Sequence, residues 1–133
     1  MPTDEPTNLR TSRRVLLVDS AIVAGAYASA LRARGHHVVV RHTLAEGLDC
    51  ALGDERFDVA VLDADLDIPS TGFELARKLL SKRLVKKVIV CTGTDDPFKA
   101  VMALRLGTYI PKGTPATLQE LVDAVEGELE PQP

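Results

Sequence analysis

The clearest sign of the fold is the stretch Phe57-Asp58-Val59-Ala60-Val61-Leu62-Asp63. Its four consecutive apolar or small residues, 59–62, predict a strand that is buried on both faces, as the strands of a parallel sheet are. Asp63 follows them directly, so its carboxylate should lie at the carboxyl end of the strand. Open α/β sheets bind ligands and react at this edge, and Asp63 is therefore the first candidate functional residue.

Three further apolar runs also end beside reactive polar side chains. Asp19, Thr92 and Lys112 each follow directly on such a run. One acid at a strand end carries little weight, because such an acid often only caps the next helix. Two acids, a hydroxyl and an ammonium at successive strand ends instead indicate a site that can accept a phosphoryl group.

Length and composition bound the class of protein. A chain of 133 residues suits one domain with a single core. Its formal charge of -3 and its pI near 5.6 argue against a dominant nucleic-acid surface. No apolar segment has the length of a signal-peptide core or a membrane helix, so we expect a soluble cytoplasmic protein without membrane contact.

The cysteines and histidines fit no metal or redox motif. Cys50 and Cys91 match neither a disulfide framework nor a CxxC pattern, and we expect two buried, reduced thiols. His36, His37 and His42 gather around one predicted strand, but their spacing matches no common zinc signature. We expect these histidines at the surface or along a sheet edge.

Helical and strand periodicities alternate along the chain. Residues 1–12 have the composition of a disordered lead, residues 13–129 that of one domain, and residues 130–133 that of a frayed tail. The expected strands are 13–18, 36–41, one that ends at Asp63, 87–91 and 109–111. The expected helices are 21–34 followed by Gly35, 44–53 capped by Thr43, 73–81, 97–106 preceded by Thr94-Asp95-Asp96, and a last one from Thr114-Pro115.

Five strands that alternate with five helices predict an α/β fold. The natural arrangement is a flavodoxin-like (βα)5 three-layer sandwich with a parallel sheet in the order 2-1-3-4-5. In this order the first, third and fourth strands are neighbours. Asp19, Asp63 and Thr92 should therefore converge at one edge, with Lys112 approaching from the adjacent strand.

Taken together, these motifs resemble the receiver domain of two-component response regulators. The resemblance covers residues 13–128 and rests on four motifs in the right order. They are Val15-Leu16-Leu17-Val18-Asp19, Phe57-Asp58 through Asp63, Val88-Ile89-Val90-Cys91-Thr92-Gly93, and the group Gly107, Tyr109 and Lys112. Each motif alone is weak, whereas their order and spacing make the set specific.

The resemblance implies a role for each residue at this edge. Asp63 would be the phosphoacceptor, a nucleophilic carboxylate that forms an acyl phosphate. Asp19, Asp63 and the backbone carbonyl of Asp65 would surround Mg2+, which offsets the charge of the phosphoryl group. Lys112 and Thr92 would each contact a phosphoryl oxygen.

The resemblance also implies a switch, beside which simpler interpretations stand. Thr92 would move toward the phosphoryl group and open space into which Tyr109 turns. However, Thr92 could simply begin a turn, Lys112 could be a solvated loop residue, and Tyr109 is more simply a half-buried aromatic. Asp19 could equally cap the helix that follows it, and so could Ser20.

Two features at the acidic end depart from the family pattern. Receivers usually carry two consecutive acids after the first strand, whereas this chain has Asp19-Ser20, which removes a ligand and should weaken Mg2+ binding. We expect the side chain of Asp65 to compensate in part. A proline commonly lies four positions beyond the phosphoacceptor, and Pro69 would select Asp65 by that count. The end of the apolar run favours Asp63.

The favoured function is a phosphoacceptor signalling protein and not a classical enzyme, although Mg2+-dependent self-phosphorylation from a small donor would be compatible. A histidine kinase or histidine phosphotransfer protein would donate to Asp63, and a switched surface would engage an unknown protein target. That surface is altered here, because Gly107-Thr108-Tyr109 is about two residues shorter than usual and Gly113 replaces a proline. We expect a monomer or weak dimer without direct nucleic-acid binding, and output either through another protein or through an output region outside this sequence.

Two alternative functions stay open. The first is a degenerate receiver that binds partners without phosphorylation, for which Ser20 is the main argument and against which Asp63, Thr92 and Lys112 speak together. The second is a small flavodoxin-like binding protein or enzyme. It is disfavoured because the chain has no glycine-rich phosphate loop of the dinucleotide-binding or Walker A type.

Overall fold

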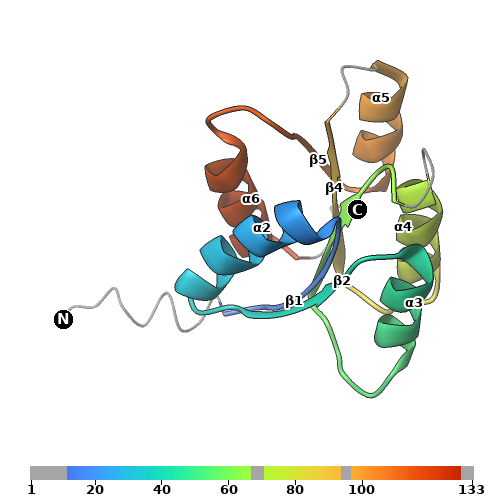
Figure 1. Ribbon diagram of the computed structural model, residues 1–133. Coiled ribbons are helices and arrows are strands. Elements are labelled where there is room, and N and C mark those ends of the chain that lie inside the picture. The colour runs from blue at the N-terminus through green and yellow to red at the C-terminus, as the bar shows by residue number, and fades with distance from the viewer. Residues whose placement is uncertain (1–11, 67–70, 94–96, 130–133) are drawn as a thin grey trace.

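The computed structural model describes residues 12–66, 71–93 and 97–129, and within them five parallel strands form one sheet in the order β2-β1-β3-β4-β5 (Figure 1). The strands are β1 Arg14–Val18, β2 His37–Arg41, β3 Val59–Asp63, β4 Lys87–Thr92 and β5 Thr108–Pro111. The helices are α2 Ala21–Ala33, α3 Leu44–Leu52, α4 Thr71–Ser81, α5 Pro97–Leu106 and α6 Thr117–Glu126. The predicted fold class and strand order are confirmed.

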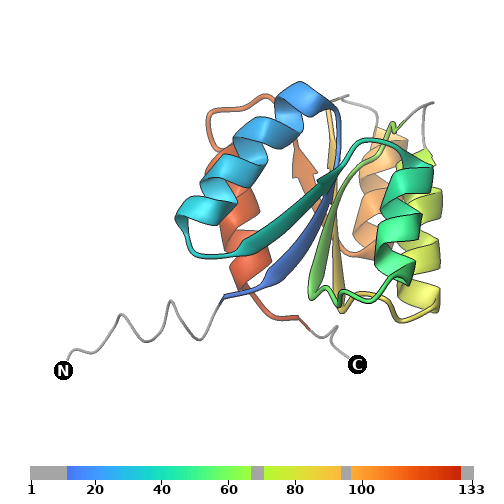
Figure 2. The ribbon, with the colours of Figure 1, turned by 60° about the horizontal axis from the view of Figure 1, so that its bottom comes forward.

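The sheet separates two hydrophobic cores. Helices α2 and α6 cover one face, while α3, α4 and α5 cover the other (Figure 2). Successive strand residues point to opposite faces, so Val61 of β3 packs toward α2 and α6, while Leu62 packs toward the other helices. Both faces of β3 are therefore buried, which explains why its sequence is a continuous apolar run and not an alternating one.

Several local signals place the helix ends as predicted. Gly35 follows α2 with a φ of 94°, a conformation that favours glycine. The Thr43 hydroxyl accepts a hydrogen bond from the backbone N–H of Glu46 at 3.1 Å and so caps α3. Pro97 begins α5, but the predicted cap at residues 94–96 lies outside the described residues.

The last helix begins later than predicted, at Thr117 and not at Thr114. The Thr114 hydroxyl accepts a hydrogen bond from the N–H of Ala116, and the N–H of Thr114 donates to the Thr117 hydroxyl at 3.1 Å. These side-chain hydrogen bonds hold a turn that takes the place of a first helical turn. Helix α4 begins two residues earlier than predicted, at Thr71, whose hydroxyl bonds to the carbonyl of Leu66.

The predicted lead at residues 1–12 and tail at residues 130–133 lie outside the described residues, except for Ser12. The hydroxyl of Ser12 donates to the carbonyl of Gly35 at 2.9 Å. None of the helices that the structure describes is both long and apolar enough to cross a membrane.

The two cysteines differ in their surroundings. Cys91 lies fully buried in β4, and burial raises the pKa of its thiol to about 12. Cys50 lies on α3 and is only half-buried, so the prediction of two buried thiols is wrong for this residue. Neither cysteine is in a disulfide.

His36 is 4% exposed and so is not a surface histidine, but it directly precedes the edge strand β2, in agreement with the alternative prediction of a sheet-edge position. Its Nδ1 accepts a hydrogen bond from the N–H of Arg13 at 3.0 Å, and its Nε2 donates to Glu126 at 2.9 Å. Glu126 also accepts two hydrogen bonds from Arg34, at 2.7 and 2.9 Å. This cluster joins α6 to the end of α2 and the start of β1, at the amino edge of the sheet.

Replacing Glu126 with glutamine should make the thermal stability of the protein depend less on pH in the acid range. The hydrogen bond from Arg34 lowers the pKa of Glu126 below its ordinary 4.5, and His36 lowers it further. A carboxylate with a lowered folded pKa contributes stability above its unfolded pKa and loses it as the pH falls through the folded value. We expect Glu126→Gln to melt below the parent at neutral pH, with the gap closing as the pH falls below 4.5.

Thermal unfolding followed by circular dichroism between neutral and acid pH measures this gap. Glu120→Gln is the matched control, because Glu120 lies on the same helix but is exposed. A gap that stays constant across this pH range would contradict the role given to the Glu126 carboxylate.

Candidate functional site

Four of the predicted site residues lie at the carboxyl edge of the sheet. Asp19 follows β1, Asp63 ends β3, Thr92 ends β4 and Lys112 follows β5. In the sheet, Asp63 is in register with Cys91, and Thr92 is in register with Pro111. Because parallel strands all end at the same edge, four segments far apart in the sequence meet there.

Lys112 joins the two acids. Its ammonium lies 2.8 Å from Oδ2 of Asp19 and 3.4 Å from Oδ2 of Asp63. The N–H of Lys112 donates to the carbonyl of Thr92 at 2.9 Å, which holds its backbone beside β4. Thr92 itself is 1% exposed. Asp19, Asp63 and Lys112 therefore share one ion-pair cluster.

Burial dominates the electrostatics of this cluster. Asp19 is 1% exposed, and burial raises its pKa; Lys112 lowers that pKa, while the charge of Asp63 raises it. Burial also lowers the pKa of Lys112, but attraction to Asp19 and then to Asp63 outweighs it and leaves the pKa raised. The ammonium is thus held in its charged form between two carboxylates.

The oxygen atoms of this cluster suit a hard divalent cation. Oδ1 of Asp19 accepts a hydrogen bond from the N–H of Ser20 at 2.7 Å. Oδ2 is buried and is paired with the ammonium of Lys112 at 2.8 Å. A buried carboxylate oxygen held by a cationic group fits a cation ligand, and carboxylate oxygens are the ligands that Mg2+ prefers.

A complete three-acid metal cluster is not formed by the described residues, because Asp65 points to a different partner. The N–H of Asp65 donates to Oδ1 of Asp63 at 3.0 Å, but its Oδ1 lies 2.7 Å from the ammonium of Lys99. The side chains of Asp19 and Asp63 thus lie together beside Lys112, whereas that of Asp65 is paired with Lys99. Metal binding by Asp19, Asp63 and Asp65 stays a prediction.

Two residues beside the site were not predicted to lie there. Lys99 lies in the first turn of α5, and only 14% of its side chain is exposed. His42 follows β2 at the same edge, and its ring Nδ1 donates to the backbone carbonyl of Asp19 at 2.9 Å. The topology offered a signal for both, because helix starts and strand ends meet at this edge, but no local motif marks them.

The switch prediction is not tested by the geometry. Tyr109 is half-buried in β5 and packs against the core beneath α3, α4 and α5. This placement agrees equally with an ordinary half-buried aromatic. Its role as a switch stays a prediction.

Helix α4 touches the end of β3 through backbone atoms. Gly72 lies in the first turn of α4, and its N–H donates to the carbonyl of Ala64 at 2.9 Å. A Cβ atom at this position would overlap the carbonyl oxygen of Asp63. The helix can therefore approach the end of β3 only because residue 72 has no side chain.

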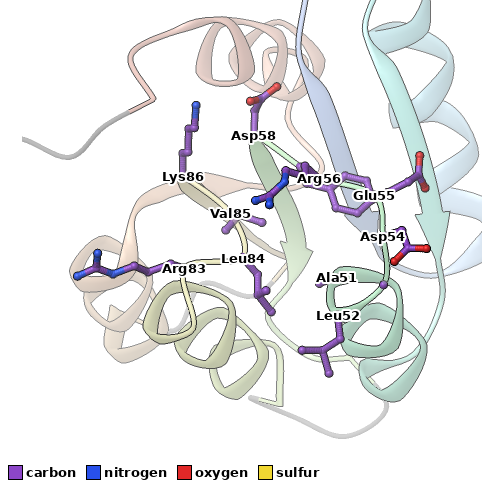
Figure 3. A pocket seen from close by; sticks show the side chains of 12 residues that line it. Ala51, Leu52, Asp54, Glu55, Arg56, Asp58, Arg83, Leu84, Val85 and Lys86 are labelled. Atoms are coloured by element: carbon purple, nitrogen blue, oxygen red, sulfur yellow. The ribbon is translucent and has the colours of Figure 1, made fainter.

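A surface depression of about 450 Å³ lies at the opposite edge of the sheet, around the start of β3 (Figure 3). Asp58 lines it, and Oδ2 of Asp58 accepts a hydrogen bond from the N–H of Arg14 at 2.8 Å. Asp58 therefore ties β1 to β3 at the amino edge. It plays no part in the cluster around Asp63.

The known proteins that resemble this chain were found by comparison of structures and not of sequences. No protein-family model and no curated protein matches the sequence. A receiver domain protein of Methanospirillum hungatei JF-1 is similar, with 29% identity, a TM-score of 0.71, and coverage of 84% of this chain and 89% of that one. A response regulator of Burkholderia pseudomallei also has 29% identity, with a TM-score of 0.72 and coverage of 86% of this chain and 66% of that one.

A third similar structure shares the fold at lower identity. The receiver domain of the Francisella response regulator 1452 has 22% identity, a TM-score of 0.72, and coverage of 86% of this chain and 93% of that one. Strand order, helix placement and these matches define a flavodoxin-like α/β protein of the CheY type. More particularly, the chain has the fold of a response regulator receiver domain, as its motifs predict.

Proposed function

We propose that this chain is a response regulator receiver that accepts a phosphoryl group on Asp63 from a histidine kinase or a histidine phosphotransfer protein. The single observation that carries this proposal is the Lys112 ammonium, which lies within 3.4 Å of the carboxylates of both Asp19 and Asp63. The Burkholderia pseudomallei structure is described as containing a phosphorylated aspartic acid and a calcium ion, which supports the same chemistry on this fold.

In the proposed transfer, Asp63 attacks the phosphorus as a carboxylate. A bond forms between a carboxylate oxygen and phosphorus while the P–N bond to the donor phosphohistidine breaks, and its electron pair stays on the imidazole nitrogen. No proton has to leave Asp63. Mg2+, held by Asp19, Asp63 and the carbonyl of Asp65, would offset charge on the phosphoryl oxygens.

Lys112 would serve the phosphorylated state as well as the resting one. In the structure it balances two carboxylates, and transfer would add a dianionic group to Asp63. Because an ammonium binds a dianion more strongly than a monoanion, Lys112 would shift toward a phosphoryl oxygen. The hydroxyl of Thr92, on the adjacent strand, would bond a second oxygen, and Tyr109 would respond.

The proposed surface for a downstream protein is formed by α5, β5 and α6. Three large apolar side chains of α5 are exposed, and α6 adds one more: Phe98 at 68%, Val101 at 50%, Leu104 at 62% and Leu118 at 43%. Their spacing along α5, at every third residue, places them on one side of the helix. Exposed large apolar side chains gathered on one side of a helix mark interaction sites.

One observation favours the second candidate, a receiver that binds partners without phosphorylation. Ser20 stands where a second acid would help to hold the cation, and its N–H donates a hydrogen bond to Oδ1 of Asp19. If Mg2+ binds too weakly, Lys112 alone would keep Asp19 and Asp63 paired. The surface on α5 and α6 would then act without a phosphoryl switch.

Beryllofluoride, a phosphoryl mimic, separates the two candidates. We expect the full chain with Mg2+ and beryllofluoride to show backbone NMR shifts around Asp63, and a small phosphodonor to add the mass of one phosphoryl group. Asp63→Asn should show neither change, whereas Asp49→Asn, which alters an exposed acid of α3, should match the parent. A parent without any Mg2+-dependent shift or adduct would refute phosphoacceptance and favour the phosphorylation-independent candidate.

A further inference from the structure

We propose that Lys99 sets the cation affinity of the site by competing with Mg2+ for Asp65. This inference rests on the proposed function, since it concerns the same cation. It adds a residue from α5 to a site that is otherwise built from strand ends. Two facts carry it: the ion pair between Lys99 and Asp65, and the hydrogen bond that holds the backbone of Asp65 beside Asp63.

The ion pair is short and shielded. Nζ of Lys99 lies 2.7 Å from Oδ1 of Asp65, and the two side chains are 14% and 26% exposed. An ion pair that is largely removed from solvent is screened less than one at the surface, so it competes effectively with another cation. The pairing therefore holds back a carboxylate that could otherwise serve the site.

Asp65 is well placed to matter because its backbone is already part of the cluster. Its N–H donates to Oδ1 of Asp63 at 3.0 Å, which fixes its main chain beside the phosphoacceptor. In the structure its carboxylate is paired with Lys99, and an exchange of Lys99 for the cation would require a rotation of the Asp65 side chain.

The balance of charges around the site determines how strongly this competition affects cation binding. Three carboxylates, of Asp19, Asp63 and Asp65, face two ammonium groups, of Lys112 and Lys99. Ser20 has already removed one acid from the expected set. Because ligand charge largely determines the affinity of an oxygen site for a divalent cation, Lys99 lowers that affinity further.

The same ion pair ties α5 to the site. Lys99 is the third residue of α5, whose exposed side carries Phe98, Val101 and Leu104. A cation that drew Asp65 away would release Lys99 and with it the first turn of α5. Occupancy of the cation site would in this way reach the proposed partner surface.

Direct Mg2+ titration of the full chain, followed by backbone NMR without any phosphodonor, tests the proposal. We expect Lys99→Met to bind Mg2+ about three- to tenfold more tightly than the parent. Lys82→Met is the matched control, because Lys82 is exposed just after α4, at the amino edge of the sheet, and its loss changes the net charge equally. The control should bind Mg2+ like the parent.

A double-mutant cycle with Asp65→Asn separates competition from simple loss of charge. If Lys99 acts through Asp65, removing Lys99 should tighten binding far less in the Asp65→Asn background than in the parent. Equal tightening in both backgrounds, or a Lys99→Met variant that matches Lys82→Met, overturns the inference. A parent that binds Mg2+ and beryllofluoride keeps the proposed function in either case, whereas a parent that binds neither refutes that function.

Discussion

Replacing Lys112 with methionine is expected to lower the free energy of unfolding by about 3 kcal/mol near neutral pH, because it leaves a buried carboxylate without its counter-ion. The ammonium is 16% exposed and its partner Asp19 only 2%, so solvent cannot replace it. The response to beryllofluoride should also disappear. Urea unfolding gives the stability change, and NMR gives the loss of response.

The pH dependence of this variant identifies the cause. Burial and the charge of Asp63 raise the pKa of Asp19 above 3.8, and Lys112 opposes them, so its removal must raise that pKa further. An acid with a raised folded pKa destabilises the fold above that pKa and ceases to do so below its unfolded value. The deficit of Lys112→Met should therefore shrink as the pH is lowered.

A double variant provides the control. Asp19→Asn together with Lys112→Met removes the buried charge along with its partner, and it should recover most of the lost stability. A deficit that is independent of pH, or a double variant no more stable than Lys112→Met, would show that lost packing and not the uncompensated carboxylate is responsible.

Replacing Gly72 with alanine is expected to cost about 3 kcal/mol or more, a loss typical of severe overpacking. The new methyl group would overlap the carbonyl oxygen of Asp63, so either α4 or the end of β3 must move. The displacement should appear as NMR shifts around Asp63 even in the folded state. Thermal and urea unfolding measure the loss of stability.

Gly25→Ala is the matched control, because Gly25 lies within α2 and a Cβ there meets no atom within 4 Å. Alanine in an exposed helix interior is favoured over glycine by up to about 1 kcal/mol, so this variant should be slightly more stable than the parent. A Gly72→Ala variant within about 0.5 kcal/mol of the parent would mean that α4 can retreat without cost.

The parts of the structure that the sequence predicts are those governed by short-range pattern and topology. The buried run before Asp63 specifies a two-sided strand, and the order of the strands brings Asp19 and Lys112 to the same edge. Both conclusions need only hydrophobic pattern and the handedness of crossovers. They do not depend on where any side chain turns.

The parts that the sequence does not predict depend on contacts between distant side chains. His36 can be buried because Glu126, ninety positions away, accepts a hydrogen bond from its ring Nε2. Lys99 and Asp65 pair across a separation of 34 residues, and no local motif announces the choice of partner. The late start of α6 depends on hydroxyl hydrogen bonds of Thr114, which compete with helix formation on nearly equal terms.

Because the two cysteines differ in burial, their rates of reaction with a thiol reagent can report local opening of the core. Cys91 packs in the core between the sheet and helices α2 and α6 and is 0% exposed, so a thiol reagent reaches it only when that core opens. Cys50 is half-buried on α3, so smaller fluctuations are enough to expose its thiol to the reagent. The ratio of their labelling rates would report how often the core beneath the site opens, and the measurement needs no substitution.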